Sequence, residues 1–418
     1  MKLKQALLII FLPAAAALAV DTGLKISNSP VEMHGFYELR AGYRLRNDKH
    51  EKDMSIMENR FQLDFGSYPE WGELRFKGDA VGDLVLERFD FKTREAYIFT
   101  RPSDNMDLIV GRQILTWGTG DLVFINDLFP KDWQSFFIGR DDEYLKAPSD
   151  AAKLSMFGDF ANLDVVFTPR FDPDIFVSGQ RISYWNQNTL RIEGKNIETS
   201  VDKPDRWFRD YELAARLYKN VNEYEYALYA YRGFWKIPAG QNADGKAIFP
   251  DLNVYGASVR GKVAKGIGNL ELGYYESADD QSGKKSSVDN SQMRYLAGYK
   301  QEIGKDLTLG LQYYIEQILS YQDYLDNLPK GPAKDEFRHL VTVRLTKLLM
   351  NQNLRLNLFA YYSPSDKDCY FRPSINYKAT DNIALEAGAN IFFGDYPNTF
   401  FGQFTDNTNI YTSVRYSF

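Results

Sequence analysis

Basic side chains take alternate positions along many extended segments of this chain, so they gather on one face of the strands. An Arg guanidinium binds a carboxylate or phosphate through paired hydrogen bonds, and a Lys ammonium attracts the same anions as a point charge. Counted by this period of two, the face carries about 19 basic against about 11 acidic residues. The whole chain has a formal net charge of −6, so the acidic excess must lie in the loops. The basic positions are Arg40, Arg44, Arg46, Arg60, Arg75, Lys77, Arg112, Lys153, Arg216, Arg260, Lys262, Arg294, Lys300, Arg338, Arg344, Arg355, Arg372, Lys378 and Arg415.

Rings of Arg and Lys select anions when they line a water-filled path. The spacing therefore favours an anion-preferring path. A wall of Arg–Glu pairs that only solvates a weakly selective pore is the alternative.

Long amphipathic strands must position these residues. Residues 307–315, 354–360 and 383–391 alternate apolar residues with polar ones such as Arg355 and Glu386. A slip of one residue would move these charges into lipid, at a cost of about 2–4 kcal/mol at the bilayer midplane. Such segments recur from about residue 35 onward, separated alternately by tight turns and long polar loops. The pattern predicts an all-β fold, a closed transmembrane antiparallel β-barrel of about 18 strands with short periplasmic turns and long extracellular loops.

Both ends of the sequence agree with export to an outer membrane. Met1–Ala19 has a basic start, an apolar run and a small-x-small cleavage site, which predicts a signal peptide. Asn409–Phe418 alternates in polarity and ends on an aromatic residue, as the last strand of a barrel does; the alternative is the edge strand of a soluble sandwich. Phe418 is therefore the candidate assembly signal read by the barrel assembly machinery. We expect residues 20–418 to form a single barrel domain in the outer membrane of a Gram-negative bacterium.

Composition supports a barrel over a soluble domain or a helical membrane protein. Phe, Trp and Tyr make up 15% of the residues, although the mean hydropathy is −0.42. A barrel reconciles the two values, because alternate residues face a wet lumen while aromatic residues crowd both membrane interfaces. Cys369 is the single cysteine in the sequence, so no internal disulfide can form.

One local motif stands out. Gly111-Arg112-Gln113 is followed by Trp117-Gly118-Thr119-Gly120-Asp121 and then by a turn-rich segment, Asn126–Trp133. The loop that it opens, residues 116–150, is far longer than a hairpin requires and is rich in Phe, Leu, Ile and Trp. We expect the loop to enter the lumen, pack on Tyr314, Phe359 and Tyr361, and pair its Asp residues with Arg112; a surface loop with well-formed turns is the alternative. The candidate constriction residues are Trp117, Gly118, Gly120, Asp121, Asn126, Asp127, Pro130 and Asp132.

The motif resembles the outer-membrane channels of the alginate export porin family. The specific part of the resemblance is Gly111 to Trp133, and the rest of the chain agrees only in pattern. It implies an 18-stranded barrel with an Arg-lined lumen that is constricted by inward loops. The acids that interleave with the basic residues in this sequence depart from a path built for a polyuronate.

These observations favour a passive outer-membrane channel for small or polymeric anionic solutes. The alternative is a barrel that sheathes a periplasmic or secreted partner, such as a polysaccharide export or electron-transfer complex. His34, His50 and His339 suggest neither a catalytic set nor metal-ligand spacing, so we expect no enzyme, no metal and no cofactor; an outer-membrane hydrolase is the less favoured alternative. The expected partners are outer-membrane lipids, the assembly machinery and an anionic solute or polysaccharide, with no nucleic acid, and we expect a monomer.

Overall fold

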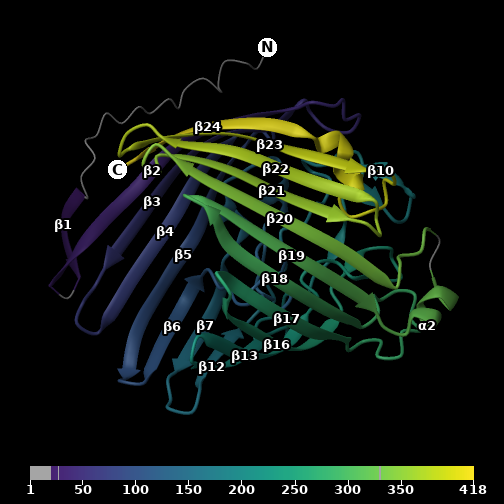
Figure 1. The fold of residues 1–418 in the computed structure, drawn as a ribbon, viewed down its shortest axis with the longest axis horizontal. Coiled ribbons are helices and arrows are strands. Elements are labelled where there is room, and N and C mark those ends of the chain that lie inside the picture. Colours follow the sequence, from purple (N-terminus) through teal and green to yellow (C-terminus); the bar gives the residue numbers. More distant parts are fainter. Residues whose placement is uncertain (1–19, 27, 329–330) are drawn as a thin grey trace.

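The alternating segments form a closed barrel in the computed structural model, which describes residues 20–26, 28–328 and 331–418 (Figure 1). Within these residues, 18 strands pair in series as antiparallel neighbours, and the last strand pairs with the first. The predicted fold class is confirmed. The strands are β2 (Ser29–Arg44), β3 (Met54–Ser67), β4 (Gly72–Asp83), β5 (Arg88–Ser103), β6 (Met106–Gln113), β7 (Ser149–Met156), β8 (Asn162–Thr168), β12 (Glu212–Val221), β13 (Tyr224–Phe234), β16 (Asp251–Val263), β17 (Gly266–Ser277), β18 (Gln292–Gly304), β19 (Leu307–Ile318), β20 (Phe337–Leu349), β21 (Leu354–Ser363), β22 (Asp368–Lys378), β23 (Ile383–Gly394) and β24 (Asn409–Ser417).

The two ends of the barrel differ as the turn pattern predicts. At one end the strands are joined by tight turns, as between Val221 and Tyr224 or between Val263 and Gly266. At the other end, the described parts of the long connections carry four short helices: α1 (Trp133–Ile138), η1 (Asp142–Leu145), α2 (Tyr321–Asp326) and η2 (Gly402–Asn407). They also carry a small sheet of β9 (Tyr184–Asn186) with β10 (Arg191–Glu193), and another of β11 (Val201–Asp202), β14 (Gly240–Gln241) and β15 (Ala247–Ile248). The C-terminus lies at the end opposite α2 (Figure 1).

The two faces of the wall follow the period of two. Leu39, Val110, Ile375 and Val414 point outward and are about half exposed, while inward residues such as Tyr370 are fully buried. The buried apolar core thus lies inside the barrel, between the wall and the loops folded into it. No helix of the described residues is long and apolar enough to span a bilayer. The predicted signal peptide, residues 1–19, lies outside the described residues.

The barrel closes between its first and last strands. β24 runs along β2 from Asn409 opposite Arg44 to Ser417 opposite Phe36. Phe418 continues the ladder: its amide donates to the Gly35 carbonyl at 2.9 Å and its carbonyl accepts from the Gly35 amide at 3.0 Å. The Phe418 ring stacks on Phe61 with the ring centroids 6.0 Å apart. Beyond this point β1 (Val20–Ile26) takes the place of β24 beside β2.

Candidate functional site

The lumen wall carries most of the predicted basic residues. They occupy the strand positions that alternate with exposed apolar residues, so their side chains face the interior. The inward residues among the predicted pore-lining set are Arg40, Arg44, Arg60, Arg75, Lys77, Arg216, Arg260, Lys262, Arg294, Lys300, Arg344, Arg355, Arg372 and Lys378.

Arg112 is the exception, and its predicted inward position is wrong. Its neighbours across the ladder are Ala96 and Asp150, in a register that runs through this part of β6 without a bulge. Arg112 therefore shares the outward face with Val110, and it binds Asp150 through two hydrogen bonds of 2.7 and 2.6 Å. Gly111 holds the inward position, where a Cβ atom would lie 2.3 Å from the Ala96 carbonyl oxygen. Asp150 is the last residue of the predicted loop, 116–150, so Arg112 does pair with one of its Asp residues; in the structure this residue belongs to β7, and the pair lies within the wall.

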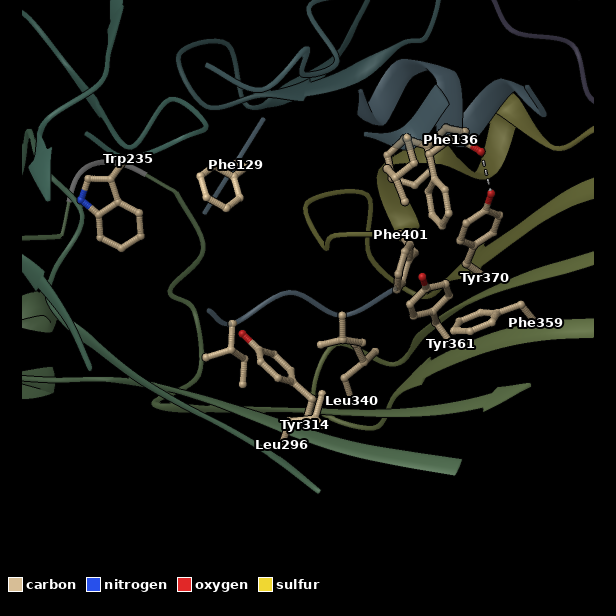
Figure 2. Packing of buried hydrophobic residues seen from close by; sticks show 14 of the residues in the cluster. Phe129, Phe136, Trp235, Leu296, Tyr314, Leu340, Phe359, Tyr361, Tyr370 and Phe401 are labelled. Atoms are coloured by element: carbon tan, nitrogen blue, oxygen red, sulfur yellow. Dashed lines mark hydrogen bonds between the residues drawn. The ribbon is translucent and has the colours of Figure 1, made fainter. Parts of the chain in front are cut away.

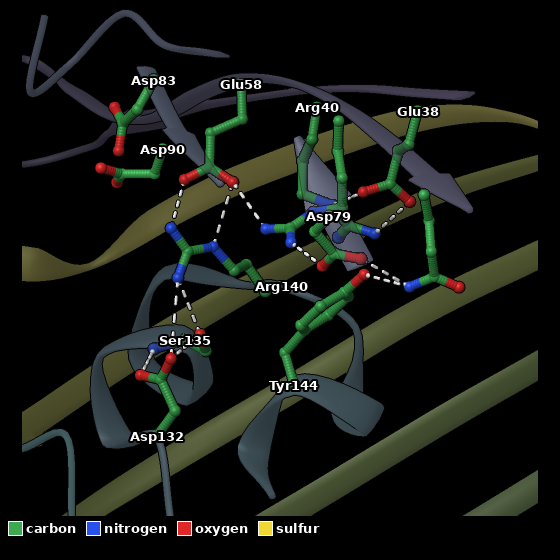
Figure 3. Close-up of polar contacts among 12 residues, drawn as sticks. Glu38, Arg40, Glu58, Asp79, Asp83, Asp90, Asp132, Ser135, Arg140 and Tyr144 are labelled. Atoms are coloured by element: carbon green, nitrogen blue, oxygen red, sulfur yellow. Dashed lines mark hydrogen bonds and ion pairs between the residues drawn. The ribbon is translucent and has the colours of Figure 1, made fainter. Parts of the chain in front are cut away.

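The connection between β6 and β7, residues 114–148, is inside the barrel and is called here the inserted loop. One part of it is held by Glu58 on β3. The Glu58 carboxylate binds Arg140 of the loop (Figure 3). It also lies 3.3 Å from the Arg60 guanidinium. Arg140 also donates to Ser135 Oγ at 2.7 Å, which links the anchor to α1. Since these side chains are buried, removal of one partner would leave an uncompensated charge, at a cost of about 3–5 kcal/mol.

Aromatic packing fixes the middle of the inserted loop against the wall. Phe136 and Phe137 of α1 each lie 5.7 Å from Tyr370, measured between ring centroids, and Phe137 lies 4.6 Å from Phe404 of η2. Tyr370 also donates a hydrogen bond of 3.2 Å to the Phe136 carbonyl (Figure 2). The predicted packing surface of Tyr314, Phe359 and Tyr361 belongs to the same cluster. The loop therefore lies in the lumen, as its apolar composition predicts.

The predicted constriction residues divide into three structural roles. Gly118, Gly120 and Asn126 surround the carboxylate of Glu271 on β17. Asp121 faces Arg344 of the wall. The remaining residues shape the loop itself: Trp117 packs on Phe129, Asp127 pairs with Lys131, Pro130 accepts the Ala147 amide through its carbonyl, and Asp132 caps α1 through the Ser135 amide.

The acids of the inserted loop pair with arginines of the wall. Asp121 lies 2.6 Å from Arg344, Asp142 lies 2.9 Å from Arg372, and Asp141 lies 3.4 Å from Arg415. Burial raises the pKa of Asp142, but Arg372, Arg344 and Arg355 together outweigh burial, so the pKa is lowered. In the sequence, residues 141–143 are only a run of acids, because nothing local shows which wall residues a folded loop will meet.

A second long connection clasps the inserted loop. Asp174, between β8 and β9, accepts hydrogen bonds from the Lys131 amide at 2.9 Å and from Trp133 Nε1 at 2.7 Å. Burial raises the pKa of this carboxyl to about 6, although Lys131 acts in the opposite direction. The sequence carried no signal for this contact.

One stretch of the wall, β16–β22, has inward cations that form no ion pair with a carboxylate of the wall within the described residues. Five of them, Arg260, Lys300, Arg344, Arg355 and Arg372, are called here the basic band. Arg344 and Arg372 pair with the loop, whereas Arg260, Lys300 and Arg355 form no ion pair within the described residues and are exposed to the lumen. The inward acids of these strands are mostly engaged, Glu271 by the loop and Glu316 by Arg294. The band therefore presents unneutralised positive charge to the lumen.

Comparison with solved structures identifies the same architecture elsewhere. OccK2 (OpdF) of Pseudomonas aeruginosa, solved in complex with glucuronate, superposes with a TM-score of 0.55 and 12% identity, covering 93% of this chain and 97% of that chain. OccK11 (OpdR) of the same organism gives a TM-score of 0.54 and 11% identity over 92% of this chain and 95% of that chain. No family model matches the sequence, and no curated protein matches it. At this identity the likeness shows the fold, which is the closed 18-stranded barrel of outer-membrane porins.

Proposed function

We propose that the protein is a passive outer-membrane channel for small anionic solutes. The observation that carries the proposal is the basic band, in which Arg260, Lys300 and Arg355 face the lumen without a carboxylate partner in the described residues. Anions are concentrated by such charges, because paired charges cancel at a distance while unpaired ones do not. The predicted pore-lining role of the other inward basic residues belongs to the same proposal.

The inserted loop favours small solutes over polymers. It is anchored at Glu58 and Glu271 and packed through α1, so a polymer-sized opening would need these buried contacts to break. The same contacts occupy space that a sheathed partner would need, which disfavours the scaffold alternative. We propose the loop as the constriction. Membership of the alginate export family is proposed on the Gly111–Trp133 motif alone, and glucuronate in OccK2 suggests a sugar acid as one anion to try.

The fold and the sequence support a proposal for location and partners. We place the protein in the outer membrane of a Gram-negative bacterium, exported by the leader Met1–Ala19 and assembled through its terminal strand with Phe418. Outer-membrane lipids then surround the exposed apolar face of the strands.

Ion selectivity tests the proposal directly. Purified protein in a planar bilayer under a KCl gradient should give a reversal potential displaced from zero toward the equilibrium potential of chloride. Glucuronate added to one side should reduce the chloride current if it enters the same path. A reversal potential on the potassium side would reject anion preference, and the absence of channels from heat-modifiable, folded protein would reject the channel itself.

A further inference from the structure

We infer that Glu271 is the positioning residue of the constriction: its carboxylate is the anchor around which the first part of the inserted loop folds. Glu271 Oε2 accepts the Thr119 amide at 2.9 Å, the Thr119 hydroxyl at 3.0 Å and the Gly120 amide at 3.2 Å. Glu271 Oε1 accepts the Asn126 amide at 2.8 Å and its side-chain amide at 3.0 Å. Both carboxylate oxygens are thus engaged by one loop.

This carboxylate differs from several other acids of the wall, which pair with an arginine. Glu38, Glu58 and Glu316 are each neutralised by an Arg, whereas Glu271 has no cationic partner within the described residues and is only 4% exposed. A buried charge of this kind is stable only when its hydrogen-bonding capacity is filled. The backbone amides of the loop supply that capacity, so the loop and the carboxylate depend on each other.

The glycine motif of the sequence has its explanation here. Gly118 has a φ of +79°, and a Cβ atom on it would lie 2.9 Å from Glu271 Oε1. On the wall side, a Cβ atom on Gly256 would lie 1.7 Å from Asn126 Oδ1. Side chains at either position would push the loop away from β16 and β17. The glycines of the Trp-Gly-x-Gly-Asp sequence therefore let the loop backbone surround a carboxylate of the same chain.

The hydrogen bonds between Glu271 and the loop, called here the clamp, fix the position of the Asp121 carboxylate. Directly after Gly120, the Asp121 amide donates to Gln312 Oε1 at 2.6 Å and the Asp121 carbonyl accepts from Gln312 Nε2 at 2.8 Å. Its carboxylate then reaches Arg344 of the basic band. Because Glu271 is buried beneath the loop, it acts through the loop, by holding one acid against one arginine.

A substitution at Glu271 tests this role. In Glu271→Gln the carboxamide retains one acceptor and presents a donor to the loop amides, so we expect the loop to leave the wall. Loss of one hydrogen bond to a charged group should shift the equilibrium between the wall-bound and released loop by about tenfold or more. Cleavage of the loop by thermolysin in detergent should therefore accelerate by at least about tenfold. Single-channel conductance should rise, and its level should fluctuate with time as the loop moves.

Glu302→Gln is the matched control, because it removes an inward charge that makes no contact with the loop. Re-tethering gives the rescue: Thr119→Cys with Asn269→Cys replaces a side-chain contact of 3.1 Å by a disulfide, in a Cys369→Ser background. In Glu271→Gln, this cross-link should restore loop protection and conductance, and dithiothreitol should abolish the rescue.

The outcomes separate this inference from the proposed function, on which its conductance readout rests. If wild-type protein forms no channels but Glu271→Gln exposes the loop to thermolysin, the channel proposal fails and the positioning role stands. If Glu271→Gln and Glu302→Gln behave alike in both assays, the positioning role is refuted. If Glu271→Gln does not fold, Gly118→Ala strains the same clamp from the loop side, and unchanged cleavage and conductance in that variant overturn the inference.

Discussion

Reversal of the Arg355 charge is the sharpest test of anion preference. Arg355 faces the lumen from β21, pairs with no carboxylate in the described residues and makes no hydrogen bond to the inserted loop. It is nevertheless close enough to the constriction to lower the pKa of Asp142. Arg355→Glu therefore changes the electric field at the constriction without removing a contact that holds the loop, which a change at Arg344 or Arg372 would do.

The expected magnitude follows from Coulomb's law. An ion that passes about 8 Å from the guanidinium in a water-like medium interacts with it by about 0.5 kcal/mol. An anion and a cation differ in their interaction energy with residue 355, and charge reversal changes this difference by about four times that value. Screening in 0.1 M salt reduces the change to about 0.9 kcal/mol. The ratio of chloride to potassium permeability should fall about fivefold.

Reversal potentials under a KCl gradient measure this ratio. Arg260→Glu should act in the same direction, and Lys284→Glu, in an exposed outer connection, should leave the potential within experimental error of the wild type. The effect of Arg355→Glu should shrink in 1 M salt, where the screening length is about 3 Å. A shift no larger than that of Lys284→Glu, or one that does not depend on salt, would refute the assignment of selectivity to the basic band.

Three further predictions concern the loop and the assembly of the barrel. Deletion of residues 122–137 removes α1 and its aromatic packing, so single-channel conductance should rise severalfold while heat-modifiability persists; unchanged conductance would place the constriction elsewhere. Because the pKa of Asp174 is raised to about 6, above an unfolded value of about 4, its contribution to stability is present at low pH and falls as the pH rises from about 4 to about 6. The temperature at which SDS resistance is lost should show this fall in the wild type and not in Asp174→Asn. Phe418→Ser removes the ring stacked on Phe61 and should lower the amount of assembled barrel without reducing secretion, as judged by immunoblots of outer-membrane and periplasmic fractions.

The fold was predictable from the sequence because the period of two is enforced locally. A residue such as Leu358 must alternate with Arg355 or Asn357 if one side of the strand meets lipid and the other meets water. The same rule would have placed Arg112 correctly, because this residue shares its parity with Leu108 and Val110. The motif around it suggested an inward role, but the unbroken register through Gly111 turns the side chain outward.

The partners of the inserted loop were not predictable in the same way. Its apolar residues required a surface, which located the loop in the lumen, but pairs such as Asp142 with Arg372 join positions 230 residues apart on separate elements. The role of Glu271 was hidden for the same reason, since an alternating strand shows only that the residue faces inward. The glycines of the motif did signal an unusual backbone, although not the carboxylate that it encloses.

The charged residues of the lumen therefore fall into two classes with different expected effects. Charges that meet a partner, such as Glu58 with Arg140 or Asp121 with Arg344, cancel at a distance and fix the position of the loop. Charges without a partner, such as Arg260 and Arg355, make no contact with the loop and, under the proposed function, set the electric field along the path. A substitution in the first class should alter the size of the opening and its stability together, and one in the second should alter selectivity alone. Because residues of the second class make no contact with the loop, substitutions there can change selectivity without loss of the fold.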